Sequence, residues 1–332
     1  MNDYKLKLEV FKLTLNASNS VEDPNFRDMF SLKFSEGQRE LNNIELFVNY
    51  NRFLSQSLDN KGEYHQINKK SKRAFSLSKL PKLNSKNQYV YGFVKGGFKG
   101  DNKTSSNIID KNESESLDNK VIDNQHFFIL YTPLESDTGF LIFQSCPQES
   151  IRLEFVNFIS RYIFKHGKTY RKPKIQPYLT KAIKDEFKEG AIISQMTFTD
   201  KVMSNVLSNS RSFSNEPSHY KVKVVIEPSG EGKLTYKNFN DFNFFDKFKN
   251  KVILGKPLND YFKKKGQLSK SGDKTPFTIN GGDDILPIVR LGSGYLNDKG
   301  TPNFESVKKY SFELLKDIKE EFYENNKSLI IE

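Results

Sequence analysis

Hydrophobic and polar residues alternate along several short stretches in the first half of the chain, a pattern typical of β-strands. Residues 4–15 predict a strand whose alternation slips by one residue near its middle, as at a β-bulge. Residues 88–98 predict a second strand, and residues 43–55 fit either a strand or a short helix. The runs 126–131 and 139–143 are apolar almost throughout and flank a polar turn, so they predict a buried hairpin.

The second half of the chain mixes helical and strand-like patterns. After Pro147, apolar residues recur every three or four positions and predict a helix that ends near Gly167. Residues 191–198 predict a strand and 200–207 a helix. Residues 220–226 predict a strand with one largely wet face, since lysines alternate there with apolar side chains. Residues 263–283 contain a run of three lysines and several glycines, which favours a loop.

This order of elements predicts a mixed α+β protein: a β-rich N-terminal half, then alternating helices and strands, and a long C-terminal helix between Val307 and Phe322. We expect a β-rich domain at 1–146, a helix and basic connector at 147–190, and an α+β domain at 191–332. The first domain carries a stretch at 101–124 that is poor in apolar side chains, and we expect it to be a flexible insertion.

Positive charge is segregated along the chain. The sequence has 52 Lys and Arg against 41 Asp and Glu, a formal charge of +11. Ten basic residues and one acid lie between 61 and 100, and eight basic residues and no acid lie between 161 and 184. The composition, rich in Lys and Asn and poor in Ala, is also what AT-rich codons give, so the total charge alone is weak evidence. The clustering is better evidence for an anionic partner.

The cysteine content and the N-terminus favour a cytoplasmic protein. Cys146 is the one cysteine, so no intrachain disulfide can form, and we expect it to be buried as a small apolar residue. The first residues lack the apolar core of a signal peptide, and no run of eighteen apolar residues predicts a membrane span. We therefore expect no membrane partner, and no cofactor motif is present.

Arg161 and His166 form the first candidate for catalysis. The stretch Arg161-Tyr-Ile-Phe-Lys-His166 resembles the short motif of HEPN-type ribonucleases, which are all-helical proteins. The resemblance implies that the arginine holds an RNA phosphodiester while the histidine moves a proton, without a metal. The alternative is the basic end of a helix, where cations are favourable next to the helix dipole.

A second candidate lies after the strand predicted at 220–226. Glu227, Glu231 and Lys233 resemble the carboxylates and lysine of the metal-dependent PD-(D/E)xK nucleases, in which two acids hold Mg²⁺ and the lysine helps to activate water. The glycines and the proline of this stretch also fit a plain hairpin turn. The pair Asp283 and Asp284 beside two glycines is a further metal candidate, and here too a turn is the alternative.

The leading hypothesis is a nucleic-acid-binding or sensing module, with DNA or RNA as partner, that acts through one basic surface formed by the two windows. Lysine and arginine neutralise phosphates, and exposed tyrosines stack on unpaired bases. The residues expected to contact nucleic acid are Lys69, Lys70, Lys72, Arg73, Lys165, Lys168, Tyr170, Arg171, Lys172 and Lys174. The alternatives are a nuclease that uses either candidate set above, and a protein-interaction subunit of a larger assembly without catalysis.

Overall fold

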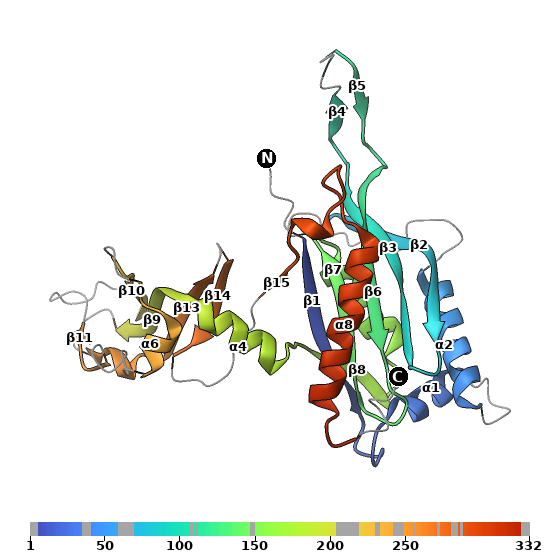
Figure 1. Cartoon of the computed structure of the whole chain (residues 1–332), viewed down its shortest axis with the longest axis horizontal. Helices are drawn as coiled ribbons and strands as arrows, with labels where there is room; N and C mark the ends of the chain where they lie inside the picture. The colour runs from blue at the N-terminus through green and yellow to red at the C-terminus, as the bar shows by residue number, and fades with distance from the viewer. Residues whose placement is uncertain are drawn as a thin grey trace. The chain divides into compact units, whose positions relative to one another are not determined.

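The computed structural model describes most of the chain, and two compact units divide it (Figure 1). The described residues are 6–34, 41–58, 70–106, 109, 112–146, 150–203, 219–229, 233–241, 249–254, 256–270, 273–279, 285 and 288–326. Unit 1 comprises Met1–Tyr178 and Val289–Glu332, and unit 2 comprises Leu179–Ile288. Unit 2 is therefore an insertion in the chain of unit 1.

The mixed α+β class is confirmed, with its β-rich first half and its long last helix. The units are divided at positions other than those expected from the sequence. The helix and basic strand within 147–178 belong to unit 1, and the C-terminal helix returns to unit 1 rather than completing a domain at 191–332. The physical reason is that this helix covers a face of the first sheet, a long-range contact that local patterns do not encode.

Unit 1 is built on an antiparallel sheet of seven described strands. They are β1 (Lys7–Ala17), β2 (Arg73–Asn84), β3 (Tyr89–Lys99), β6 (Val121–Tyr131), β7 (Thr138–Ser145), β8 (Tyr170–Pro177) and β15 (Val289–Arg290). The order is β15-β1-β7-β6-β3-β2, and β8 pairs with β1 on the side away from β7. Strands β8 and β15 therefore share one edge of the sheet, and β2 forms the other.

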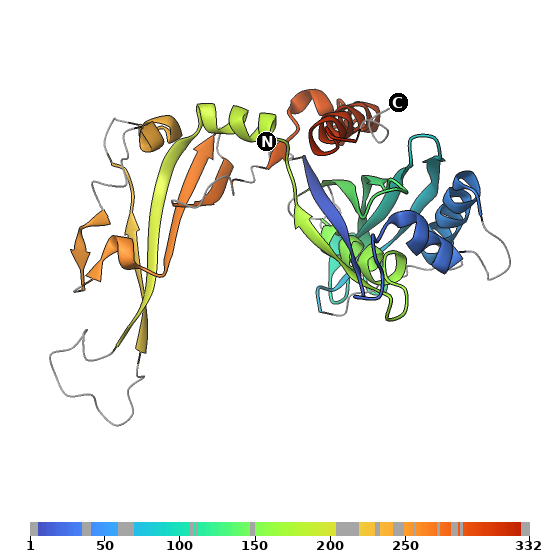
Figure 2. The same ribbon diagram turned by 90° about the horizontal axis from the view of Figure 1, so that it is seen from below.

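Helices cover both faces of this sheet (Figures 1 and 2). On one face lie α1 (Phe26–Phe34), α2 (Asn43–Leu58) and α3 (Arg152–Phe158), which share a core with alternate strand residues such as Val94 and Phe128. On the other face lies α8 (Phe304–Phe322), where the Phe312 ring centre is 5.1 Å from that of Tyr89. Since both faces are covered, the runs 126–131 of β6 and 139–143 of β7 are buried throughout, as the sequence predicts.

The long C-terminal helix is the element that the sequence predicts most directly. Its apolar stripe is buried at Val307, Leu314 and Ile318. Its first turn is capped by Asn303, whose side-chain oxygen accepts a hydrogen bond of 3.2 Å from the backbone N–H of Ser306. A 3₁₀ turn, η3 (Ser293–Tyr295), precedes it.

The phase slip in the first strand is not a bulge against its neighbour. β1 pairs with β7 in continuous register from Lys7 to Thr14. Leu8 and Val10 are buried on the face that carries α8, whereas Phe11 and Leu13 are buried in the core on the opposite face. The apolar positions change phase because the buried face changes along the strand. A register shift does occur further along β1, against β8 after Thr14.

Two further segments of unit 1 can be compared with the sequence predictions. The stretch 43–55 lies in helix α2, not in a strand. The expected insertion at 101–124 contains the short strands β4 (Thr104–Ser106) and β5 (Ser114–Ser116), which pair with each other, and its last residues belong to β6. Figure 1 shows this exposed ribbon continuing β3 and β6 beyond the sheet.

Unit 2 contains a second antiparallel sheet, with the order β10-β9-β13-β14. Its strands are β9 (Ile192–Met203), β10 (His219–Ile226), β13 (Lys263–Lys270) and β14 (Asp273–Thr278). The other elements are α4 (Lys181–Gly190), α6 (Tyr236–Asp241), η2 (Leu258–Asp260) and the paired strands β11 (Val252–Ile253) and β12 (Lys256–Pro257). Side chains of these elements, such as Phe187 and Phe239, form the core on one face of the sheet.

Two sequence predictions in unit 2 are wrong. The stretch 263–283 is not a loop up to Thr278, because β13 and β14 form a hairpin there. The helix predicted at 200–207 is strand as far as Met203, and its remaining residues lie outside the described part of the chain. Strand β13 escapes recognition because only Gly266 and Leu268 of its first six residues are buried. Gly266 is required there, since an added Cβ would lie 2.0 Å from the Phe277 ring.

Candidate nucleic-acid interface

The two basic windows expected to form one surface lie at opposite edges of the sheet of unit 1. The first window includes β2 and β3, and the second includes β8. Strands β6, β7 and β1 separate β3 from β8. With neighbouring strands about 4.8 Å apart, β2 and β8 are separated by roughly 24 Å across the sheet. The expected continuous surface is therefore not what the strand order produces.

Within the first window, part of the basic set has a structural role. The guanidinium of Arg73 lies 4.5 Å from the centre of the Phe98 ring and is half-buried, so this arginine packs on the sheet. Lys70 and Lys72 are exposed in the turn before β2. Lys69 lies outside the described residues.

Of the six residues of the second window that were expected to contact nucleic acid, five are exposed cations and one, Tyr170, is not available. Tyr170 is fully buried in the core of unit 1, which corrects its predicted role in stacking on bases. Its ring belongs to the core that unit 1 forms with α1 to α3, whereas Arg171 and Lys172 next to it are exposed. The exposed members are Lys165, Lys168, Arg171, Lys172 and Lys174. We call Arg171, Lys172 and Lys174 the β8 edge.

Arg161 and His166 lie in a tightly held turn rather than in the all-helical setting of HEPN-type ribonucleases. Arg161 is exposed on η1 (Ile159–Ile163), one turn of π-helix that continues α3. The backbone of His166 exchanges hydrogen bonds of 2.9 and 3.0 Å with that of Tyr170. Lys33 donates to carbonyl oxygens of this segment, including that of Ile163 at 2.7 Å, and desolvation lowers its pKa to about 8. The surrounding antiparallel sheet does not match the fold that the resemblance implies.

The second nuclease candidate is only partly described. Glu227 follows β10, is exposed, and accepts a hydrogen bond of 2.6 Å from the side-chain amide of Gln195. Lys233 is exposed as well, whereas Glu231 lies outside the described residues, as does the pair Asp283 and Asp284. Among the described residues, no three His, Cys, Asp or Glu side chains lie together as a metal site would need.

A basic surface that the sequence windows miss lies on the sheet of unit 2. Residues that pair directly in an antiparallel sheet point to the same face. Three exposed lysines are related in this way to the central strand: Lys223 and Lys263 both pair with Thr199, and Lys265 pairs with Thr197. The residues of β9 that alternate with these threonines, such as Phe198 and Met196, lie on the other face of the sheet, in the core. We call the exposed set the lysine face; it comprises Lys201, Lys221, Lys223, Lys263 and Lys265.

The lysine face places like charges next to one another. Lys201 on β9 and Lys221 on β10 are direct cross-strand partners. Such partners have Cβ atoms about 5 Å apart, and like charges at that distance destabilise a sheet. The intervening positions are small and polar, with Thr197 and Thr199 half-buried on the central strand. An anion that bridges the lysines would turn this repulsion into attraction.

A hollow of about 510 Å³ lies at one end of the lysine face. It is lined by Thr199, Asp200, Lys201, Lys221, Phe262 and Lys263, and we call it the Phe262 hollow. The phenyl ring of Phe262 is 80% exposed, whereas that of its neighbour Tyr261 is buried. The hollow thus combines three cations with one accessible aromatic ring, the two kinds of group that contact phosphates and bases.

The one carboxylate of the Phe262 hollow is already neutralised. Asp200 forms an ion pair with Lys256 and accepts a hydrogen bond of 2.8 Å from the backbone N–H of Lys201. The bond from Lys256 holds the pKa of Asp200 below its usual value, so the side chain stays a charged partner of Lys256. The three lysines that line the hollow therefore keep their positive potential.

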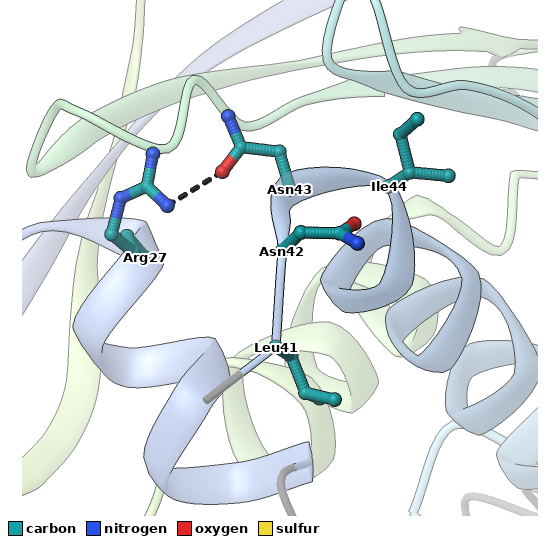
Figure 3. Close-up of a pocket in the computed structure, with 5 residues that line it drawn as sticks. All are labelled: Arg27, Leu41, Asn42, Asn43 and Ile44. Atoms are coloured by element: carbon teal, nitrogen blue, oxygen red, sulfur yellow. Dashed lines mark hydrogen bonds between the residues drawn. The ribbon is translucent and has the colours of Figure 1, made fainter. Parts of the chain in front are cut away.

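A second hollow, in unit 1, offers less for an anion. It measures about 570 Å³ and is lined by residues of α1 and of the start of α2, among them Arg27, Asn43 and Ile44 (Figure 3). The one cation among its described lining residues is engaged, because Arg27 pairs with Glu135 and donates a hydrogen bond of 2.5 Å to the side-chain oxygen of Asn43. We therefore place the candidate interface on unit 2.

Sequence reasoning did contain part of the signal for the lysine face. The alternation of 220–226 indicates that Lys221 and Lys223 lie on one wet face. The run 263–265 contains the lysines of β13, but its three adjacent charges make the stretch resemble a loop. Only the register across β9 brings the two groups together, and that register is not readable from one strand.

Comparison with known proteins supplies no family for this chain. No family model matches it, and a search of curated proteins gives no significant match. Among the described helices, none has the length and apolar character to cross a membrane.

Proposed function

We propose that this protein binds nucleic acid in the cytoplasm and that the lysine face of unit 2 is the contact surface. The carrying observation is that five exposed lysines from three adjacent strands share one face of a sheet whose other face is a packed core. This arrangement gives a high local density of positive charge on a sheet that is supported by a packed core. Binding would consist mainly of contacts to phosphates, with release of counterions.

The charge of unit 2 supports the same assignment. Its 110 residues contain eighteen Lys and Arg against thirteen Asp and Glu. Two acids on or directly after strands of this sheet are engaged: Glu227 accepts from Gln195, and Asp200 pairs with Lys256. A polyanion approaching this face therefore meets cations that are not already neutralised by these acids.

The test compares two variants of the full chain that lose the same formal charge. One carries Lys221→Gln, Lys223→Gln and Lys265→Gln on the lysine face, and the other carries Arg171→Gln, Lys172→Gln and Lys174→Gln on the β8 edge. Fluorescence anisotropy with a labelled 20-nucleotide DNA or RNA of mixed sequence is measured across a salt series. We expect the first variant to bind more weakly, and its salt slope to fall by about 2 for a single strand.

Two results would refute the proposal. Affinity of the parent chain that does not weaken as salt rises would remove the electrostatic basis of binding. Equal losses in the two variants would show that only overall charge matters and that the lysine face is not the contact surface.

A further inference from the structure

We propose that the Phe262 hollow is a subsite for one unpaired nucleotide, with the base stacked on the Phe262 ring and a phosphate held by Lys201, Lys221 and Lys263. The inference rests on the proposed function and narrows it: the preferred ligand is single-stranded nucleic acid. In a duplex the faces of the bases are hidden in the stack, so a ring on the protein has nothing to contact. In a single strand they are free.

The position of Phe262 is fixed by its two neighbours. On one side, Tyr261 is buried, its ring meets that of Phe198 edge to face at 6.4 Å, and its hydroxyl donates a 3.1 Å hydrogen bond to the carbonyl oxygen of Ile253. On the other side, Lys263 begins β13 and pairs with Thr199. A ring held between two anchored residues loses little freedom when it binds, which favours affinity.

Phe262 does not belong to the core that the described residues of unit 2 form. The core on the opposite face of the sheet is formed by other aromatic residues, among them Phe198, Phe239 and Phe277. Phe262 instead points away from that core and is 80% exposed beside three lysines of the lysine face. Contact with water does not stabilise an exposed apolar ring. A nucleobase, which is flat and has polar edges, would cover the ring.

The cations lie where the phosphates of a stacked nucleotide would need them. The ammonium of Lys263 is 5.9 Å from the centre of the Phe262 ring. Lys201 and Lys221 face each other across β9 and β10 in the same hollow. The volume of about 510 Å³ is within the range of pockets that bind small molecules. The volume is therefore compatible with a ligand the size of one nucleotide.

The experiment uses the full chain and two probes of equal length: a labelled oligothymidylate of 15 nucleotides and a mixed-sequence 15-base-pair DNA duplex. The variants are Phe262→Ala and Phe262→Trp, with Val252→Ala as the control, since Val252 is a 62% exposed apolar residue outside the lysine face. We expect Phe262→Ala to weaken single-strand binding about tenfold, which corresponds to about 1.4 kcal/mol. Duplex binding should change less than twofold, and Val252→Ala should change neither.

Phe262→Trp keeps the stacking surface and gives the chain its one tryptophan, since the sequence has none. We expect it to bind the single strand at least as tightly as the parent, and its fluorescence to be quenched when the oligothymidylate binds. If Phe262→Ala weakens both probes equally or neither, or if the tryptophan is not quenched, the subsite is refuted. The proposed function is tested separately. It is refuted if the variant with Lys221→Gln, Lys223→Gln and Lys265→Gln binds nucleic acid as tightly as the parent chain.

Discussion

The β8 edge and the lysine face are both rich in positive charge, but they differ in what the charge does for the fold. The β8 edge lies on a strand that pairs with β1 and with no other described strand. Charged side chains on an edge strand keep it from pairing with other molecules, so cations are useful there without a ligand. The lysine face lies on β9 and β13, which are interior strands, and on β10, which forms an edge of the described sheet. On the interior strands charge has no such use and costs stability.

This difference shows why charge density along the chain is a poor guide to charge density on a surface. The windows 61–100 and 161–184 are the most basic by sequence, yet their strands lie at opposite edges of one sheet. The lysine face draws from β9, β10 and β13, none of which lies in either window. Cross-strand register, rather than adjacency in sequence, brings its lysines together.

The largest effect is expected from charge reversal, which tests the comparison directly. Lys221→Glu, Lys223→Glu and Lys263→Glu together should weaken binding to a 20-nucleotide single strand by more than about a thousandfold at low salt, because each change replaces attraction by repulsion. The corresponding reversal of Arg171, Lys172 and Lys174 should cost less than about tenfold. Anisotropy titrations measure both. A larger loss at the β8 edge would reverse the ranking of the two regions.

A second difference between the units is their response to acid. Burial lowers the pKa of His126 in β6 to about 4 from an ordinary value of 6.5. Between these pH values the unfolded state binds a proton that the folded state excludes, so the free energy of unfolding decreases as the pH falls, by up to about 3 kcal/mol. The one histidine of unit 2, His219, is exposed. Unit 1 should therefore be the more acid-sensitive unit.

Hydrogen exchange at pH 7, 5.5 and 4.5, followed separately for peptides of β6 and of β9, measures this difference. His126→Leu should flatten the pH dependence in β6. If β6 and β9 lose protection in parallel in the parent chain, the buried imidazole is not the cause.

The third prediction separates folding of unit 2 from folding of unit 1. Gly266→Ala introduces a Cβ that would lie 2.0 Å from the Phe277 ring, so β13 or β14 must shift, at a cost of about 2 kcal/mol. Gly292→Ala is the matched control, because nothing lies within 4 Å of an added Cβ there. Thermal unfolding and limited proteolysis should show a loss confined to unit 2 for Gly266→Ala. Equal stability of the two variants would mean that the ring moves aside freely.

The smallest effect is expected from a single change. Lys265→Gln removes one cation from the lysine face and should lower the salt slope for a single strand by about 0.7, with a loss of affinity of about two- to threefold. Lys174→Gln on the β8 edge should leave the slope unchanged. A slope that falls equally in both variants would mean that the ligand contacts both regions.

Local pattern was sufficient where an element carries its own signal. The stripe of Val307, Leu314 and Ile318 defines α8 without reference to its partner, and the apolar runs of β6 and β7 define a buried hairpin. Pattern failed where tertiary contacts decide. β13 begins with three lysines, buries only Gly266 and Leu268, and places Gly266 against Phe277, so its sequence resembles a loop. The change of buried face along β1 resembles a bulge for the same reason.

The candidate site was less predictable than the fold. Tyr170 was expected to be exposed because cations surround it in the sequence, but its ring is buried in the core of unit 1, a tertiary contact that the neighbouring residues do not indicate. Phe262 gave no signal, since a single phenylalanine beside lysines is as typical of a core position as of an exposed one. Its exposure follows from Tyr261 taking the buried position next to it.

The two strands that flank unit 2 both hydrogen-bond to β1, and this makes unit 2 easy to delete or replace. The backbone N–H of Tyr178 donates to the carbonyl oxygen of Val10, and Val289 pairs with Leu8. The points where the polypeptide leaves and re-enters are thus about two residues apart along one strand, roughly 7 Å. A glycine-rich tetrapeptide could replace residues 179–288, and a foreign domain with neighbouring termini could be grafted in their place.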